Sequence, residues 1–172
     1  MLLLKLLQWL IKALHSEGTP GQVAAGLALG AILGLTPLMS LHNAFVFACI
    51  MLLNVSFPGA MLGWALFVPV GFLLDPLFDR LGAALLLHTP AFTPLWTSLF
   101  NVPVVPLTNF NNTVVLGSLV FALAFTAPCY WGGRWAVARY RATVGERVRN
   151  SRLYKAVTAS RAYNVYRLFR PD

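Results

Sequence analysis

The feature that most constrains this chain is a long region with almost no charge. Between Glu17 and Arg134 the charged residues are Asp75, Asp79 and Arg80. The whole chain of 172 residues is 58% hydrophobic and 10% charged, whereas soluble domains have roughly 45–50% apolar and about 25% charged residues. This excludes an ordinary soluble enzyme, a disordered protein and a disulfide scaffold. It predicts a single-domain, all-α integral membrane protein.

The net charge of +8 is concentrated at the C-terminal end. Residues 1–133 sum to zero, whereas residues 134–172 carry ten Lys and Arg against Glu146 and Asp172. Cytoplasmic segments beside membrane spans collect Lys and Arg, so residues 132–172 are expected to form a basic cytoplasmic amphipathic tail. The tail is interpreted as a topology signal on a solvated helix face or as a contact with anionic lipid headgroups, and nucleic acid is a less favoured partner. The residues expected to contact anionic lipid are Arg134, Arg139, Arg141, Arg147, Arg149, Arg152 and Lys155.

The N-terminal residues 1–14 predict an amphipathic helix. Lys5, Gln8 and Lys12 recur at helical spacing, while leucines and Trp9 cover the rest of the helix. Such a helix lies in the membrane interface with its lysines toward the headgroups. A signal anchor is the alternative, but the two lysines interrupt its apolar core.

Proline and asparagine divide residues 18–131, the expected membrane domain, into short helices. The apolar runs before each interruption have about 15 residues and reach ~24 Å, less than the ~30 Å hydrocarbon core. Residues 20–53 therefore predict a helix–turn–helix hairpin, which either re-enters on one side or forms two short spans in a distorted bilayer. The positions expected to break helices are Pro37, Pro58 and Pro69.

The first of these helices has clear local signals. Thr19 can cap its N-terminus, and Pro20 suits its first turn. Gly26, Gly30 and Gly34 are spaced by four residues, so they share one helix face. This glycine ridge predicts close approach by another helix backbone.

The second half of the membrane domain is less regular. Residues 75–106 contain several prolines and predict an interfacial helix or a second broken hairpin, with Trp96 at the headgroup level. The apolar run Thr113–Trp131 has 19 residues and is the one clear transmembrane helix, with Pro128 near its end. A basic amphipathic helix is expected from Trp135 onward.

The polar residues contain no catalytic or metal-binding motif. The histidines are isolated, the cysteines lie in apolar runs, and there is neither a phosphate loop nor a serine nucleophile elbow. We therefore expect neither an enzyme nor a bound cofactor. Intramembrane polar residues are often functional, although an interhelical hydrogen bond is favoured for His42 and Asn43, and pairing with Arg80 for the aspartates. The candidate polar site comprises His42, Asn43, Asn54, Asp75, Asp79, Arg80, Asn109, Asn111 and Asn112.

The glycines, prolines and polar residues between positions 15 and 130 carry a resemblance. The pattern is Thr19-Pro20, Ala24-Ala25-Gly26, Gly30, Gly34-Leu35-Thr36-Pro37, His42-Asn43, Asn54 and Gly63. It resembles the bacterial membrane family called domain of unknown function 2062 (DUF2062). The stretch Asn109–Gly117 looks like a Gram-negative subgroup whose members are thought to be encoded beside a large envelope protein. The resemblance implies an inner-membrane location and a larger envelope or periplasm-spanning partner, and it carries over no catalytic residue.

Two functional hypotheses follow. The favoured one is a non-enzymatic inner-membrane component that partners a larger envelope protein and assists phospholipid transport or handling. The alternative is a small homo-oligomeric transporter or channel, which needs several copies because one copy has too few spans to enclose a pathway. A lipid-modifying membrane enzyme that uses His42 or the aspartates is a third, weaker hypothesis.

Overall fold

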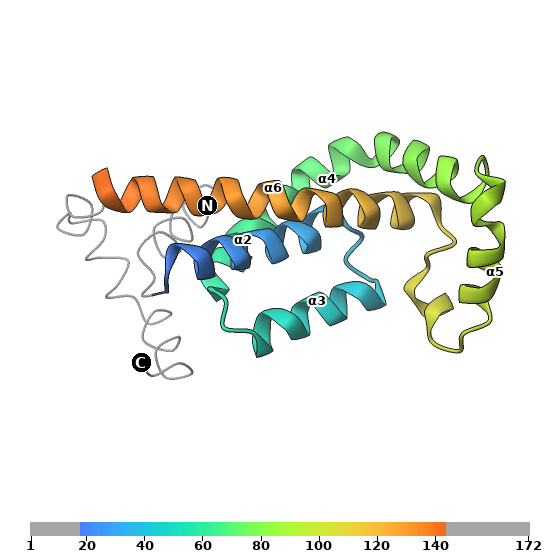
Figure 1. Cartoon of the computed structure of the whole chain (residues 1–172), viewed down its shortest axis with the longest axis horizontal. Helices are drawn as coiled ribbons and strands as arrows, with labels where there is room; N and C mark the ends of the chain where they lie inside the picture. Colours follow the sequence, from blue (N-terminus) through green and yellow to red (C-terminus); the bar gives the residue numbers. More distant parts are fainter. Residues whose placement is uncertain (1–17, 144–172) are drawn as a thin grey trace.

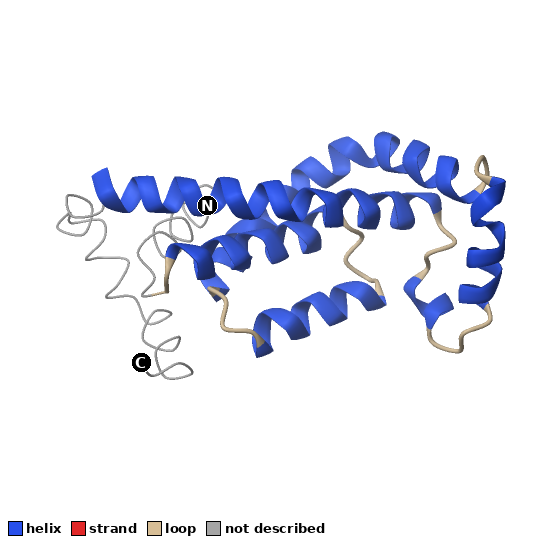
Figure 2. Ribbon diagram, viewed as in Figure 1, coloured by secondary structure: helices blue, strands red, loops and turns tan. Residues whose placement is uncertain are grey.

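The computed structural model describes residues 18–143, which fold into helices joined by loops (Figure 1 and Figure 2). Within these residues there is no strand, so the predicted all-α fold is confirmed for the part of the chain described. The amphipathic helix expected at residues 1–14 and the tail beyond Thr143 lie outside the described residues. The elements are α2 (Pro20–Leu35), α3 (Leu41–Leu52), α4 (Phe57–Leu86), η1 (Pro90–Phe92), α5 (Thr93–Phe100), η2 (Val105–Thr108) and α6 (Thr113–Thr143).

Two of the described helices, α4 and α6, are long and apolar enough to cross a membrane. They have 30 and 31 residues, whereas α2 has 16 and α3 has 12. The prediction of one clear transmembrane helix is therefore incomplete, because α4 is a second candidate. Helix α6 also runs past Trp131 without interruption, so the helix expected from Trp135 is its continuation as far as Thr143.

Helix α4 contains Pro69 and Pro76 and is nevertheless continuous. The prediction of a helix break at Pro69 is wrong, and so is the predicted boundary at Asp75. An internal proline removes one backbone hydrogen bond and crowds the preceding turn, but helices in apolar surroundings tolerate it where neighbouring helices support them. Both prolines are on the exposed side of α4, and Figure 1 shows α4 curved while α6 runs straight.

The other two prolines predicted as breaks lie at helix ends. Pro37 follows Thr36, the C-cap of α2, and Pro58 is in the first turn of α4, where its missing N–H costs no hydrogen bond. The start of α2 is a complete capping box. The Gln22 N–H donates to Thr19 Oγ1 at 3.2 Å, and the Thr19 N–H donates to Gln22 Oε1 at 2.7 Å.

Helix α2 packs against α4 backbone to backbone. A Cβ added at Gly26, Gly30 or Gly34 would lie 2.2 Å from Ser56 O, 2.0 Å from Ala60 O and 2.8 Å from Trp64 O, respectively. These distances leave no room for a side chain. The contacts advance in the same direction along both helices, so α2 and α4 run parallel.

Helices α4 and α6 also pack against each other at glycines, but these two helices run in opposite directions. A Cβ added at Gly82 would lie 1.9 Å from Thr113 O, and one at Gly117 would lie 1.9 Å from Phe78 O. The order of these contacts is reversed, so the two long helices are antiparallel. Phe78 is fully buried between them, with its ring 5.3 Å from that of Phe121.

Three segments meet at one end of the bundle, here called the basic end because α6 carries its arginines there. The Ser56 N–H donates to Gln22 O at 3.0 Å, and Arg141 Nη1 donates to Gly18 O at 2.8 Å. The loops and α5 between α4 and α6 form the opposite, distal end (Figure 1). The α2–α3 hairpin starts at the basic end and turns back beside Gly71, while α4 continues to Leu86.

Candidate functional site at the break after α2

The turn between α2 and α3 is closed by two buried polar side chains. Thr36 Oγ1 donates to Ile32 O at 2.8 Å and lies 2.8 Å from Asn43 Oδ1, so its proton is shared between two acceptors. Asn43 Nδ2 donates to Pro37 O at 2.9 Å. Thr36 and Asn43 are 5% and 4% exposed, and their hydrogen bonds tie the start of α3 to the end of α2. The interhelical hydrogen bond expected for Asn43 is of this kind.

Ser40 and His42 extend the network toward the surface of the hairpin. Ser40 Oγ donates to Pro37 O at 2.9 Å, so it accepts a hydrogen bond from His42 Nε2 at 2.9 Å. His42 Nδ1 is buried and has no hydrogen-bond partner in the described structure.

The last carbonyl groups of α2 have lost their helical donors. Pro37 has no N–H to donate to the Leu33 carbonyl, and the chain turns away after Thr36. Among the described residues no donor reaches the carbonyls of Leu33, Gly34 or Leu35. Unpaired carbonyls at a helix C-terminus carry partial negative charge, and α2 has no basic residue in its last turn to offset it.

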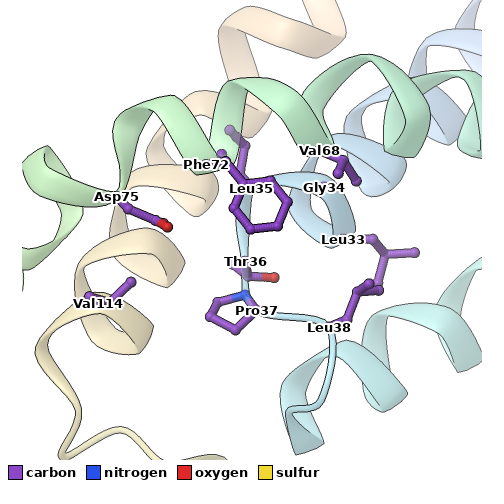
Figure 3. Close-up of a pocket in the computed structure, with 11 residues that line it drawn as sticks. Leu33, Gly34, Leu35, Thr36, Pro37, Leu38, Val68, Phe72, Asp75 and Val114 are labelled. Carbon is purple, nitrogen blue, oxygen red and sulfur yellow. The ribbon is translucent and has the colours of Figure 1, made fainter.

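A cavity of about 180 Å³ lies beside these carbonyls (Figure 3). Residues 33–38 form one wall, α4 contributes Gly71 and Asp75, and α6 contributes Val114. Figure 3 shows the carboxyl group of Asp75 directed into the space between α4 and the Thr36–Pro37 segment. Asp75 is half-buried, and within residues 18–143 its carboxylate forms no hydrogen bond or ion pair. The cavity therefore holds negative groups without a positive partner from the described residues.

A second, larger cavity of about 540 Å³ lies between α2, α3 and α4. Its walls are mainly apolar side chains, including Phe47 and Trp64, with Ser40 and Asn43 as the polar groups. Its size falls within the roughly 300–1,000 Å³ typical of small-molecule sites. Leu33 and Leu38 line both cavities, so the two spaces adjoin across the break after α2.

The remaining candidate polar residues do not join this site. Asp79 accepts a hydrogen bond from Thr113 Oγ1 on α6, and in the described part of the chain Arg80 forms no ion pair with Asp75 or Asp79. Asn54 lies before α4 at the basic end. The three candidate asparagines of the distal end lie in its turns. Asn109 is left-handed with φ 56°, Asn111 is exposed, and Asn112 Oδ1 accepts a hydrogen bond from the Val115 N–H.

Two residues of the site, Thr36 and Ser40, are not among the candidate polar residues that the sequence predicts. Thr36 belongs to the pattern that carries the family resemblance, whereas Ser40 does not. Both lie within a few residues of Pro37, where a helix end exposes unpaired backbone groups. The presence of hydroxyl groups beside a helix-breaking proline was the available signal.

Helix α3 beside this site exposes large apolar side chains. Leu52 is 85% exposed, Phe45 70% and Met51 60%, and only Asn43, Val46 and Ile50 of α3 are buried. Continuous apolar exposure of this kind marks a surface that contacts lipid or another protein.

At the basic end, Arg134 stacks over the ring of Trp131 at 5.8 Å, and Arg141 is engaged with Gly18 O. Arg139 is exposed. The structure thus places three of the residues expected to contact anionic lipid on the last turns of α6. The other residues of that set, Arg147, Arg149, Arg152 and Lys155, lie outside the described range.

Comparisons with known proteins give a family and a relative. A family model described as "Uncharacterized protein conserved in bacteria (DUF2062)" matches residues 5–144. An uncharacterized protein of Treponema pallidum is 32% identical over 146 residues, which cover 84% of this chain and 89% of that protein. No solved structure matches the chain.

Proposed function

For this chain, which belongs to the DUF2062 family of uncharacterised bacterial proteins, we propose the role of a non-enzymatic inner-membrane component in phospholipid handling. In this proposal it works with a larger envelope protein. The observation that carries the role is the cavity of about 540 Å³ at the turn of the α2–α3 hairpin, beside a helix that exposes apolar side chains.

The lengths and directions of the helices suggest how the bundle is oriented in a membrane. Helices α4 and α6 are antiparallel and each is long enough to span, and the arginines at the basic end favour the cytoplasmic side. Helices α2 and α3 have 16 and 12 residues and reach ~24 Å and ~18 Å, which is short of a ~30 Å core. A hairpin that enters from the cytoplasmic side and turns back beside Gly71 accounts for these lengths.

The larger cavity is suited to an acyl chain. Most of its wall is apolar, and Ser40 and Asn43 supply polar groups at one place only. Because α3 forms part of the wall and its outer face is apolar, a lipid reaches the cavity from the bilayer without crossing water. The hydrogen bonds at Thr36 and Asn43 hold the hairpin turn that frames this entrance.

The surface of the distal end is an argument for an envelope partner. Between Arg80 and Arg134 the sequence has no charged residue, and Leu95, Phe100 and Leu107 are exposed there. An apolar, uncharged surface at the end of two antiparallel helices is suited to the membrane interface or to an embedded partner.

The test is affinity purification of the tagged full chain from its native host in mild detergent, with mass spectrometry of bound proteins and lipids. We expect a larger envelope protein in fixed stoichiometry together with phospholipid. Ala44→Trp places a bulky ring in the larger cavity, whereas Ala48→Trp is a matched change at another exposed position of α3 that does not line it. We expect Ala44→Trp to lower bound lipid and Ala48→Trp to retain it. Equal lipid in both variants contradicts the lipid-handling role.

A second candidate function is a homo-oligomeric transporter or channel. The exposed apolar face of α3 favours it, since a second copy could cover the same side chains that lipid covers in the first proposal. Cross-linking through Cys introduced at Phe45 separates the two. Disulfide-linked dimers in native membranes support the oligomer, and their absence together with a co-purified larger protein supports the complex.

A further inference from the structure

We propose that the smaller cavity beside Asp75 binds the ammonium group of a phospholipid headgroup. This inference rests on the proposed role in phospholipid handling and names its substrate class, a phospholipid with a primary amine. The evidence is the chemistry of the cavity wall and the position of the second cavity.

The polar groups of the wall are acceptors. The Asp75 carboxylate has no partner within residues 18–143, and the carbonyls of Leu33, Gly34 and Leu35 have no donor there. The hydroxyl proton of Thr36 is already shared between Ile32 O and Asn43 Oδ1. An unpaired carboxylate in apolar surroundings is costly, so the wall is complementary to a cation that can donate hydrogen bonds. A primary ammonium has three N–H donors.

The end of α2 adds to this preference. The C-terminus of a helix carries partial negative charge, and broken helix ends with unwound carbonyls bind cations in membrane transporters. Gly71 allows the backbone of α4 to lie directly against the end of α2, because a Cβ at that position would lie 2.7 Å from Gly34 O. No arginine or lysine lines the cavity, and an anionic headgroup would meet only like charge.

The adjoining cavity decides between a lipid and a free ion. Leu33 and Leu38 separate the two spaces, so one molecule with an ammonium group and an acyl chain can use both. Phosphatidylethanolamine has this chemistry, whereas phosphatidylcholine has no N–H donor and phosphatidylglycerol has no positive charge. A free alkali cation shares the charge but leaves the apolar cavity unused.

The experiment uses the purified full chain in detergent with an equimolar mixture of phosphatidylethanolamine, phosphatidylcholine and phosphatidylglycerol of matched acyl chains. Native mass spectrometry gives the ratio of bound lipid classes. We expect phosphatidylethanolamine to be enriched about tenfold over the other lipids, the scale of one charge-assisted hydrogen bond. Asp75→Asn should return the ratio to that of the mixture while total lipid stays unchanged.

The matched control is Asp79→Asn, one turn further along α4. Its carboxylate accepts a hydrogen bond from Thr113 and does not line the cavity, so the enrichment of phosphatidylethanolamine should persist in this variant. If Asp75→Asn does not fold, Val114→Phe fills the same cavity from α6, and Val120→Phe is its exposed control on that helix. Loss of enrichment in Val114→Phe but not in Val120→Phe supports the site, and equal enrichment in both overturns it.

Other outcomes separate this inference from the proposed function. Bound lipid with the composition of the mixture overturns the headgroup site and leaves the lipid-handling role in place. Absence of any bound lipid in the wild type contradicts both. The same measurement is repeated in sodium chloride and in choline chloride of equal ionic strength. If the enrichment is lost only in sodium chloride, the cavity is assigned to alkali cations, and the lipid is overturned as its occupant.

Discussion

Helices α2 and α3 are both short and equally apolar, yet they have opposite environments. Helix α2 is buried over most of its length between α4 and α6, whereas α3 has three buried residues. The difference is side-chain size. The face that α2 turns to α4 consists of Gly26, Gly30 and Gly34, whereas α3 has no glycine and exposes Phe, Met and Leu side chains.

This comparison teaches that the apolarity of a helix does not alone decide whether the helix is buried. Lipid tails are as apolar as leucine, so helices associate through close packing and hydrogen bonds. Helix α2 is held by backbone contacts, whereas α3 is fixed mainly by Thr36–Asn43 at its start and by Val46 and Ile50 along one side. Helix α2 is thus the scaffold, and α3 is the element whose apolar side chains are exposed.

The largest expected effect is at the centre of the glycine ridge. Gly30→Leu would place a side chain against the backbone of Ala60, 2.0 Å from its carbonyl oxygen at Cβ alone. A clash with backbone cannot relax by a rotamer change, so we expect a loss of more than about 3 kcal/mol of stability. Thermal unfolding in nanodiscs and size-exclusion profiles report it. The control is Gly132→Leu, since a Cβ at Gly132 meets nothing within 4 Å, and equal unfolding temperatures for the two variants would falsify the packing role of the ridge.

The next effect lies at the hairpin turn. Asn43→Ala removes the donor to Pro37 O and leaves the buried Thr36 hydroxyl with one acceptor, which should cost about 1–3 kcal/mol. Hydrogen exchange should rise in α3 and stay unchanged in α4, because the lost bonds tie only the hairpin. Asn111→Ala, at an exposed site of the distal loop, should leave both helices as they are. Exchange that rises equally in α3 and α4 would mean that the turn is part of the scaffold.

Sequence signals predicted α2 better than α4, and the reason is the range of the interactions. The capping residue Thr19, the missing N–H of Pro37 and glycines four residues apart all act within a turn or two of one helix. Whether Pro69 breaks α4 depends instead on contacts with distant residues. On either side of it, Gly63 lies against Leu27 and Gly71 against Gly34, so α2 supports both halves of α4.

The candidate polar residues also divide into those with local partners and those with partners far away in the sequence. The juxtaposition of Thr36 and Asn43 involves residues seven positions apart and follows from the hairpin that the sequence predicts. The partner of Asp79 is Thr113, 34 residues away, and only the antiparallel packing of α4 and α6 brings them together. The sequence therefore predicts a pair between the aspartates and the neighbouring Arg80 and cannot reveal Thr113 as the partner of Asp79.

A smaller loss of stability is expected on the buried face of α3, and almost none on its exposed face. Ile50 is 3% exposed and Met51 is 60% exposed, although they are neighbours of similar size. Ile50→Ala should cost about 1–2 kcal/mol, because it opens a cavity while part of the transfer term is absent in lipid. Met51→Ala should change stability by less than about 0.5 kcal/mol. The unfolding temperatures in nanodiscs give the comparison, and similar losses for both would show that α3 has a protein partner on its outer face.

The smallest expected effect tests how far the scaffold extends toward the basic end. Arg141 Nη1 donates to Gly18 O, one residue before the Thr19 cap of α2, so this arginine links the last turn of α6 to the start of the central helix. Arg141→Gln removes the charged donor and should cost about 1 kcal/mol, with hydrogen exchange rising in the first turn of α2. Arg139→Gln removes the same charge from an exposed position and should have no effect on that turn. If the two variants behave alike in α2 but both weaken binding to vesicles that contain phosphatidylglycerol, the arginines of α6 act on the membrane surface alone. The scaffold then ends at the Thr19 cap, and α6 holds α2 only through the packing of its apolar part.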